Sequence, residues 1–302
     1  MGNYRLSNPA SNDKTRRIYE YICGNFGKRI ITAQQESIWV KGSEYEMDHL
    51  KAVTGRLPAM RGLDFKDNDF EGVVERSKEW SSRGGLVNIC WHTGVGISGY
   101  PESKEEFPDF ERLFTEGTEE NRTLMATWER GARCLQELRD ADVTVLWRPF
   151  HEFDGKWFWW GKGGAENFKR LWRMMYEKYT REYGLNNLIW VLGYADNVED
   201  GWYPGDEYCD IVGSDHYEEN GASTHKLGWE RSRALADKPA AFHECGPLPE
   251  ISDFVRDGAM WSWFMIWHSK FLMENDEGVL SRVYNDDLAV TLDKLPENLS
   301  CN

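Results

Sequence analysis

Two kinds of apolar pattern alternate along the chain. Short apolar runs of strand length are followed by longer segments in which apolar residues recur at helical spacing. The expected strands cover residues 29–33, 57–65, 86–91, 143–147, 188–192, 210–212, 240–242 and 261–267. The expected helices cover residues 15–26, 44–53 and 70–82, a segment capped by Asn121 and apolar through Leu138, and residues 168–183, 227–236 and 280–295. Each strand except the last two is separated from the next by an obvious helix.

This alternation predicts a parallel sheet, because each helical crossover returns the chain to the end of the sheet where the previous strand began. Eight such units in about 280 residues predict a closed (β/α)8 barrel, preceded here by an extra N-terminal helix. A doubly wound sheet is the weaker alternative, since no glycine-rich phosphate loop follows the first strand. Nothing resembles a linker in the 302 residues. We therefore expect a single (β/α)8 TIM-barrel domain over residues 1–302.

The stretch 143–161, VTVLWRPFHEFDGKWFWWG, joins an apolar strand to a polar and aromatic loop. The strand is followed at once by Arg148, His151 and Glu152, and four aromatic residues occupy positions 157–160. A carbohydrate site needs a carboxyl group to move protons and flat rings to stack on sugar faces. The alternative is that the aromatic residues fill a gap under a loop. The run as a whole argues against this, because consecutive residues do not all face one core.

Polar residues recur at the expected carboxyl ends of the strands, which is the face where barrels of this class keep their chemistry. They are Gln35, His92, Glu152, Asp215, Tyr217, Glu244 and Trp267. Glu152 follows the fourth strand and Glu244 the seventh, nearly opposite each other around the barrel. Two carboxyls across a cleft are the minimum apparatus for glycoside hydrolysis. The alternative for each is a salt bridge at the barrel rim, for example to Arg148.

Two other classes of protein would also explain part of this pattern. Five of the seven histidines lie at or beside strand ends, as in metal-dependent barrel hydrolases: His92, His151, His216, His243 and His268. The first strand, however, offers no His-x-His pair, and the fifth ends without a histidine. A non-catalytic sugar-binding protein would explain the tryptophans but not two convergent glutamates. We therefore favour a glycoside hydrolase and expect no metal and no cofactor.

Composition and charge narrow the choice of partner. A net charge of −15 argues against nucleic acid, anionic membranes and acidic polysaccharides, so a neutral substrate is the easier fit. The 15 tryptophans are a high number that a sugar site would explain. The six cysteines have no CxxC spacing, and we expect small buried thiols rather than a disulfide framework.

The sequence leaves the localisation open. No apolar run reaches the length of a membrane span, and no basic and apolar leader is visible at the N-terminus. We expect a secreted or cell-surface protein in which Met1-Gly2 replaces a removed leader, and we expect a monomer.

The segment RPFHEFDGKWFWWG, residues 148–161, resembles the acid/base signature of glycoside hydrolase family 26, the β-mannanase family. Further segments resemble the same family in order along nearly the whole chain: IITAQQES (30–37), WH (91–92), WYPGDEYCDIVGSDHY (202–217), HECG (243–246) and FMIWH (264–268). The resemblance implies a retaining endo-β-1,4-mannanase acting on neutral β-mannan, glucomannan or galactomannan.

The resemblance also implies roles for individual residues. Glu152 matches the general acid/base, and Glu244 matches the nucleophile, to which Tyr217 would donate a hydrogen bond. The matching substrate-binding residues are His92, His151, Trp157, Trp160, Asp215, Tyr217, Trp267 and His268. Retention predicts about 5.5 Å between the two catalytic carboxyls.

Two positions depart from the family pattern. Many members have arginine where this chain has His268, and Glu244 is followed here by Cys-Gly-Pro-Leu-Pro rather than by a more open loop. These departures leave open an exo-acting mannobiohydrolase, a β-1,3-xylanase and a mixed-linkage β-glucanase. The long loop 93–120 is expected to form a wall of the substrate groove.

Overall fold

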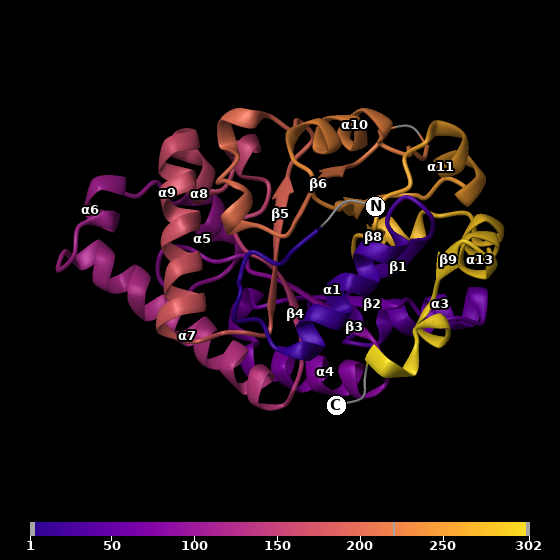
Figure 1. The fold of residues 1–302 in the computed structure, drawn as a ribbon, viewed down its shortest axis with the longest axis horizontal. Helices are drawn as coiled ribbons and strands as arrows, with labels where there is room; N and C mark the ends of the chain where they lie inside the picture. Colours follow the sequence, from indigo (N-terminus) through magenta and orange to yellow (C-terminus); the bar gives the residue numbers. More distant parts are fainter. Residues whose placement is uncertain (1–3, 220, 300–302) are drawn as a thin grey trace.

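The fold is a closed barrel of parallel strands surrounded by helices, as the computed structural model of residues 4–219 and 221–299 shows (Figure 1). The strands are β1 (Ile30–Gln35), β2 (Met60–Asp64), β3 (Leu86–Cys90), β4 (Val145–Arg148), β5 (Leu188–Tyr194), β6 (Ile211–His216), β7 (Ala240–Cys245), β8 (Trp263–Ile266) and β9 (Ala289–Val290). Strands β1 to β8 pair in sequence order, and β8 pairs back to β1, which closes the barrel. The predicted (β/α)8 fold is confirmed.

The α-helices cover the outside of the barrel or lie in the loops. They are α1 (Asp13–Asn25), α2 (Ile38–Lys41), α3 (Tyr45–Thr54), α4 (Phe70–Ser82), α5 (Tyr100–Glu105), α6 (Phe110–Phe114), α7 (Glu119–Asp140), α8 (Trp159–Lys162), α9 (Gly164–Glu177), α10 (Lys226–Leu235), α11 (Ile251–Asp257), α12 (Lys270–Met273) and α13 (Glu277–Asn285). The extra helix in front of the first strand is α1, as predicted. None of the helices in the described ranges has the length and hydropathy to cross a lipid bilayer.

The inside of the barrel is packed with side chains from all eight strands. Alternate residues of each strand point inward, and together they form one buried cluster that includes Ile31, Met60, Leu86, Leu146, Ile189, Ile211, Ala241 and Trp263. The intervening residues pack against the helices, for example Leu188 and Trp190 on β5. The filled barrel leaves its carboxyl end as the open face for a site.

The structure corrects four local predictions. The helix expected at 280–295 ends at Asn285, because an Asp286 side chain accepts the Leu288 N–H in a turn, and the chain continues as β9 beside β1. The cap of α7 is Thr118 rather than Asn121, whose backbone N–H donates to the Thr118 hydroxyl.

The other two corrections concern connections between strands. The last two barrel strands are separated by α11, whereas β5 and β6 are joined by two 3-10 turns, η4 (Asp200–Trp202) and η5 (Asp206–Tyr208). The expected loop 93–120 contains the short helices α5 and α6, which bury Phe110 and Leu113.

The described cysteines match the expectation of small thiols. All five are free, and four of them, Cys90, Cys134, Cys209 and Cys245, are buried. Cys301 and Met1-Gly2 lie outside the described residues.

Candidate active site

A pocket of about 420 Å³ opens at the carboxyl ends of the strands. Its lining is Trp39, Asp64, Lys66, His92, Tyr100, Glu152, Phe158, Tyr217, Glu244, Trp267, His268 and Phe271. Both candidate catalytic glutamates therefore face one cavity, together with aromatic rings from several loops. The sequence correctly predicted that the ends of β3, β4, β6, β7 and β8 would meet there.

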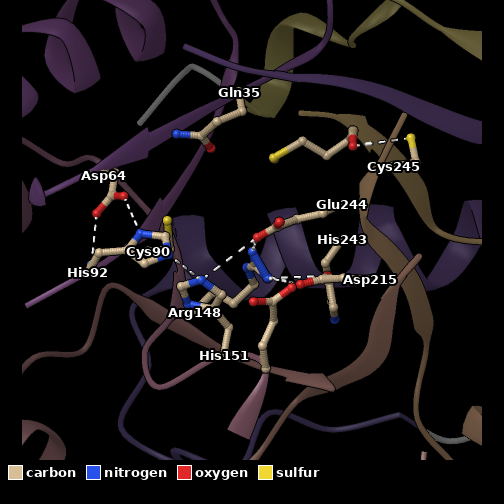
Figure 2. A network of polar contacts seen from close by, with 12 residues as sticks. Gln35, Asp64, Cys90, His92, Arg148, His151, Asp215, His243, Glu244 and Cys245 are labelled. Carbon is tan, nitrogen blue, oxygen red and sulfur yellow. Dashed lines mark hydrogen bonds and ion pairs between the residues drawn. The ribbon is translucent and has the colours of Figure 1, made fainter. Parts of the chain in front are cut away.

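Glu244 lies on β7 and is the more tightly held of the two glutamates. Its Oε2 accepts a hydrogen bond of 2.6 Å from the Tyr217 hydroxyl, and its Oε1 pairs with the guanidinium of Arg148. His151 Nε2 lies 3.8 Å from the same Oε1. Figure 2 shows Arg148 at the end of β4, reaching toward both Glu244 and Asp215. Two charge-assisted donors favour the ionised form of Glu244 and fix its orientation.

Glu152 is placed by a tight turn immediately after β4. The residue has a left-handed backbone, with φ of 54°, and Phe150 two positions earlier has φ of 52°. Such conformations cost about 1–3 kcal/mol each outside glycine and persist only where the surrounding fold imposes them. Here the Glu152 N–H donates to the Gly193 carbonyl at 2.8 Å, which ties the turn to β5. The carboxyl then lies at the pocket, where its Oε2 accepts from Trp157 Nε1 at 2.9 Å.

Three carboxyls form a compact cluster at the base of the pocket. One oxygen from each of Glu152, Asp215 and Glu244 lies within 4.8 Å of the others. Carboxyl groups lie about 5–5.5 Å apart in glycosidases that retain configuration and about 6.5–9.5 Å apart in inverting enzymes, so oxygens this close are nearer to the first arrangement. Burial raises the pKa of Asp215 well above its ordinary range; Arg148 opposes this effect, and Glu152 adds to it.

A chain of polar contacts runs from Asp64 to His151. Asp64 Oδ2 lies 2.5 Å from His92 Nδ1, and His92 Nε2 lies 3.0 Å from His151 Nε2. Burial lowers the pKa of His151 well below its ordinary range, and Arg148 lowers it further, so this imidazole is neutral. Burial alone would raise the pKa of Asp64, but the charge and hydrogen bonds of His92 outweigh it, and the pKa is lowered. Asp64 therefore orients His92, which in turn orients His151.

The aromatic run 157–160 does not act as a unit. Trp157 is 41% exposed on the rim, Phe158 lines the pocket, and Trp159 and Trp160 are 1% and 0% exposed. Trp160 donates from Nε1 to the backbone carbonyl of His151 at 2.7 Å, so it supports the site from behind. Its position is incompatible with the predicted contact with substrate. For Trp159 and Trp160, the gap-filling alternative describes the structure better.

The remaining predicted residues are divided between the pocket and its surroundings. Trp267 and His268 line the pocket, and the His268 ring packs edge-on against Trp39, with the centroids 5.0 Å apart. Burial lowers the pKa of His268 to about 4. His151 and Asp215 lie just behind the pocket surface, each at most 2% exposed.

Several residues of the pocket lining were not predicted from the sequence. Asp64 ends β2 and would have been found by the strand-end rule that found the others. Trp39, Lys66, Tyr100 and Phe271 lie in loops or short helices, where no periodicity marks them. Tyr100 belongs to the segment expected as a groove wall, and it does bring α5 to the pocket.

The fold and the site define a class: a (β/α)8 barrel that holds paired carboxyls in an aromatic pocket at its carboxyl face. The chain belongs to Glycosyl hydrolase family 26, whose sequence profile matches residues 7–294.

Three similar proteins give this membership more detail. A mannan endo-1,4-beta-mannosidase of Thermothelomyces thermophilus is 32% identical over 97% of this chain and 64% of its own length. The Podospora anserina GH26-CBM35 beta-(1,4)-mannanase has 28% identity and a TM-score of 0.89, covering 99% of this chain and 70% of that one. A beta-mannanase from a symbiotic protist of the termite Reticulitermes speratus, complexed with gluco-manno-oligosaccharide, has 30% identity and a TM-score of 0.87, covering 97% of each chain. The chain spans 51–64% of the length of the first three curated relatives that it matches.

Proposed function

We propose that the chain is a retaining endo-β-1,4-mannanase that hydrolyses β-mannan, glucomannan or galactomannan. The observation that carries the retaining assignment is the separation of Glu152 and Glu244, whose nearest carboxyl oxygens lie within 4.8 Å. A water molecule for direct attack on the sugar needs a wider gap between the carboxyls. The names of the similar proteins support mannan as the substrate.

In the proposed double displacement, ionised Glu244 attacks the anomeric carbon while Glu152 gives its proton to the departing glycosidic oxygen. The bond between the anomeric carbon and that oxygen breaks, and a glycosyl ester on Glu244 forms. Water then attacks the same carbon, gives a proton to Glu152 and releases the Glu244 carboxylate. Arg148 and Tyr217 hold Glu244 in line through both steps, and no cofactor takes part.

The other pocket residues have proposed binding roles. Trp267 offers a face for the sugar at the cleavage point, and His92 a polar contact. Trp157, which donates to Glu152 from an exposed position, has a proposed contact with the same sugar. His268 and Trp39 pack together in the pocket lining, where the preference for mannose over glucose is expected to be set.

The roles of the two glutamates are tested by product stereochemistry. Glu152→Ala should keep activity on aryl mannosides with acidic phenols, because such leaving groups need no proton, and added azide should give the β-azide. Glu244→Ala should be inactive on every leaving group and could at most give the α-azide. Inverted product from Glu152→Ala, or near-normal turnover by Glu244→Ala on activated substrates, would contradict the assignment.

Substrate and mode of attack are tested on defined polymers. Mannan should yield short oligosaccharides of several sizes from the first minutes, since an endo enzyme cuts internally. Release of mannobiose alone would indicate exo action. Faster hydrolysis of β-1,3-xylan or mixed-linkage β-glucan would assign the chain one of the other specificities.

A further inference from the structure

Outside the catalytic pocket, two histidines and a carboxylate from three segments come together. Asp196 follows β5, His216 ends β6, and His225 immediately precedes α10. Asp196 Oδ1 lies 2.7 Å from His216 Nδ1 and 3.9 Å from His225 Nδ1. One potential ligand atom from each of the three residues lies within 4.8 Å of those of the other two.

The cluster lies on the opposite side of β6 from the catalytic carboxyls. Asp215 and Tyr217 point to the pocket, where they contact Arg148 and Glu244. His216 lies between them in sequence and stacks on His225, with ring centroids 4.5 Å apart. His225 in turn packs on Trp261, outside the barrel strands. The cluster is therefore a separate constellation with its own access to solvent through Asp196, whose side chain is 63% exposed.

Each imidazole also has an oxygen partner on the nitrogen that faces away from Asp196. His225 Nε2 lies 2.7 Å from the Ser214 hydroxyl, and His216 Nε2 lies 3.4 Å from Glu218 Oε2. Histidines that ligate a metal through one nitrogen commonly have the other held by an oxygen acceptor, which fixes the ring and its tautomer. The cluster has both features: inner atoms that converge and outer atoms that are held.

We infer that Asp196, His216 and His225 form a binding site for a divalent transition-metal ion such as Zn²⁺. Two imidazoles and one carboxylate suit Zn²⁺, Cu²⁺ or Ni²⁺ rather than Mg²⁺ or Ca²⁺, which prefer oxygen ligands. Tetrahedral Zn²⁺ with bonds of about 2.0–2.1 Å places its ligand atoms about 3.4 Å apart. The present separations, from 2.7 Å to less than 4.8 Å, bracket that value.

Binding requires one local rearrangement. The two rings lie parallel, 5° apart, so their lone pairs do not meet at one point until a ring turns. His216 is the ring with room to turn, because its side chain is 22% exposed and that of His225 only 6%. The hydrogen bond between His216 and Asp196 is then replaced by two bonds to the metal.

Two other groups in the described residues bring together three potential ligands, and both belong to the catalytic pocket. In the first, Asp64 and His92 already satisfy each other at 2.5 Å. In the second, the Arg148 guanidinium already pairs with Asp215 and Glu244, two of the three carboxylates that an ion would need. Of the three groups found among the described residues, the cluster of Asp196, His216 and His225 alone combines convergent donors with an open side.

The test is titration of the full chain, without a histidine tag and stripped of metal, with ZnCl₂ by calorimetry. We expect one Zn²⁺ per chain and a thermal unfolding midpoint that rises with Zn²⁺ concentration. His216→Ala and Asp196→Asn each remove a ligand and should weaken binding by more than the roughly 10- to 100-fold that loss of an outer hydrogen bond costs. Ser214→Ala, which removes only an outer partner, should fall within that range.

The control variant is His49→Ala, because His49 is a half-buried histidine on α3. It should bind Zn²⁺ as the parent does. Co²⁺ bound to the parent should show the visible absorption of a tetrahedral site, and this absorption should be lost in His216→Ala. Absence of stoichiometric Zn²⁺ binding by the parent would overturn the inference. Undiminished binding by His216→Ala and Asp196→Asn would do so too, because it would place the ion elsewhere, for example at the catalytic carboxyls.

Discussion

Replacing Tyr217 with phenylalanine removes one hydroxyl from the site and leaves the ring in place. That hydroxyl donates to Glu244 Oε2 at 2.6 Å, and the ring packs against Phe271, with the centroids 4.7 Å apart. The substitution therefore removes a donor to the proposed nucleophile without opening a cavity. Phenylalanine also fits the same backbone, so the fold should be retained.

The expected loss follows from the strength of the bond removed. A hydrogen bond to a charged group contributes about 1.5–3 kcal/mol, and about 1.4 kcal/mol corresponds to a tenfold change in rate. Tyr217→Phe should therefore lower kcat/KM by about 10- to 150-fold. Most of the loss should appear in kcat, because the hydroxyl orients an enzyme carboxylate. The loss should be of similar size on manno-oligosaccharides and on aryl mannosides with acidic phenols, since both need the nucleophile.

The control is Tyr179→Phe, which removes a buried tyrosine hydroxyl outside the pocket lining, where it donates to the Trp128 carbonyl at 2.9 Å. Its kcat/KM should stay within about twofold of the parent even if its melting temperature falls slightly. A change of less than threefold in Tyr217→Phe, with an unaltered circular dichroism spectrum, would refute the reasoning. A loss confined to substrates with poor leaving groups would instead connect Tyr217 to Glu152.

Three further substitutions test other parts of the site. Asp64→Asn removes the charge that holds His92 and should lower kcat at least about tenfold. The melting temperature should change by no more than a few degrees. Normal kinetics would show that His92 is held in place without the Asp64 charge. Trp157→Phe keeps an exposed ring but removes the donor to Glu152. The value of kcat/KM should therefore fall about three- to tenfold on natural substrates and less on aryl mannosides with acidic phenols. Equal losses on both kinds of substrate would exclude an effect through Glu152. Burial raises the pKa of Asp154 from the ordinary 3.8 to about 6, so in that interval the folded protein binds more protons here than the unfolded chain, and stability from this group is lost as the pH rises. As the pH rises from about 4 to about 7, the melting temperature of Asp154→Asn should therefore rise relative to that of the parent. A constant difference between the two melting temperatures across this range would contradict the raised pKa of Asp154.

The barrel and the two glutamates were predictable because both depend on regular patterns. Alternating strand and helix periods determined the topology, and the residue after each apolar strand indicated the carboxyl face. Where an element lacks a period, the prediction was wrong. The two residues of β9, Ala289 and Val290, are too few to show a strand pattern, so they were assigned to the preceding helix.

The direction of individual side chains after β4 was not predictable. Phe150, Glu152 and Lys156 all have positive φ, a conformation that sequence signals mainly through glycine or asparagine. These turns send Trp157 to the rim and Trp160 beneath His151, although only two residues separate them. The pairing of Asp64 with His92 likewise depends on two strand ends that are adjacent only because β2 and β3 pair in parallel.

The charges around the pocket agree with the proposed role of Glu244. Glu152, Asp215 and Glu244 lie within 4.8 Å of one another, and one guanidinium, that of Arg148, pairs with two of them. Two like charges at that distance repel by roughly 3 kcal/mol at an effective dielectric constant of about 20, so one cation does not balance three carboxylates. This imbalance of charge favours a proton on the cluster, and the direct contacts of Glu244 with Arg148 and Tyr217 favour its absence from Glu244, the proposed nucleophile. Burial raises the pKa of Asp215 well above its ordinary range, so Asp215 is the acid that most readily holds this proton. The proposed double displacement needs an ionised carboxylate on β7 at its start, and this is the state of Glu244 that its contacts with Arg148 and Tyr217 favour.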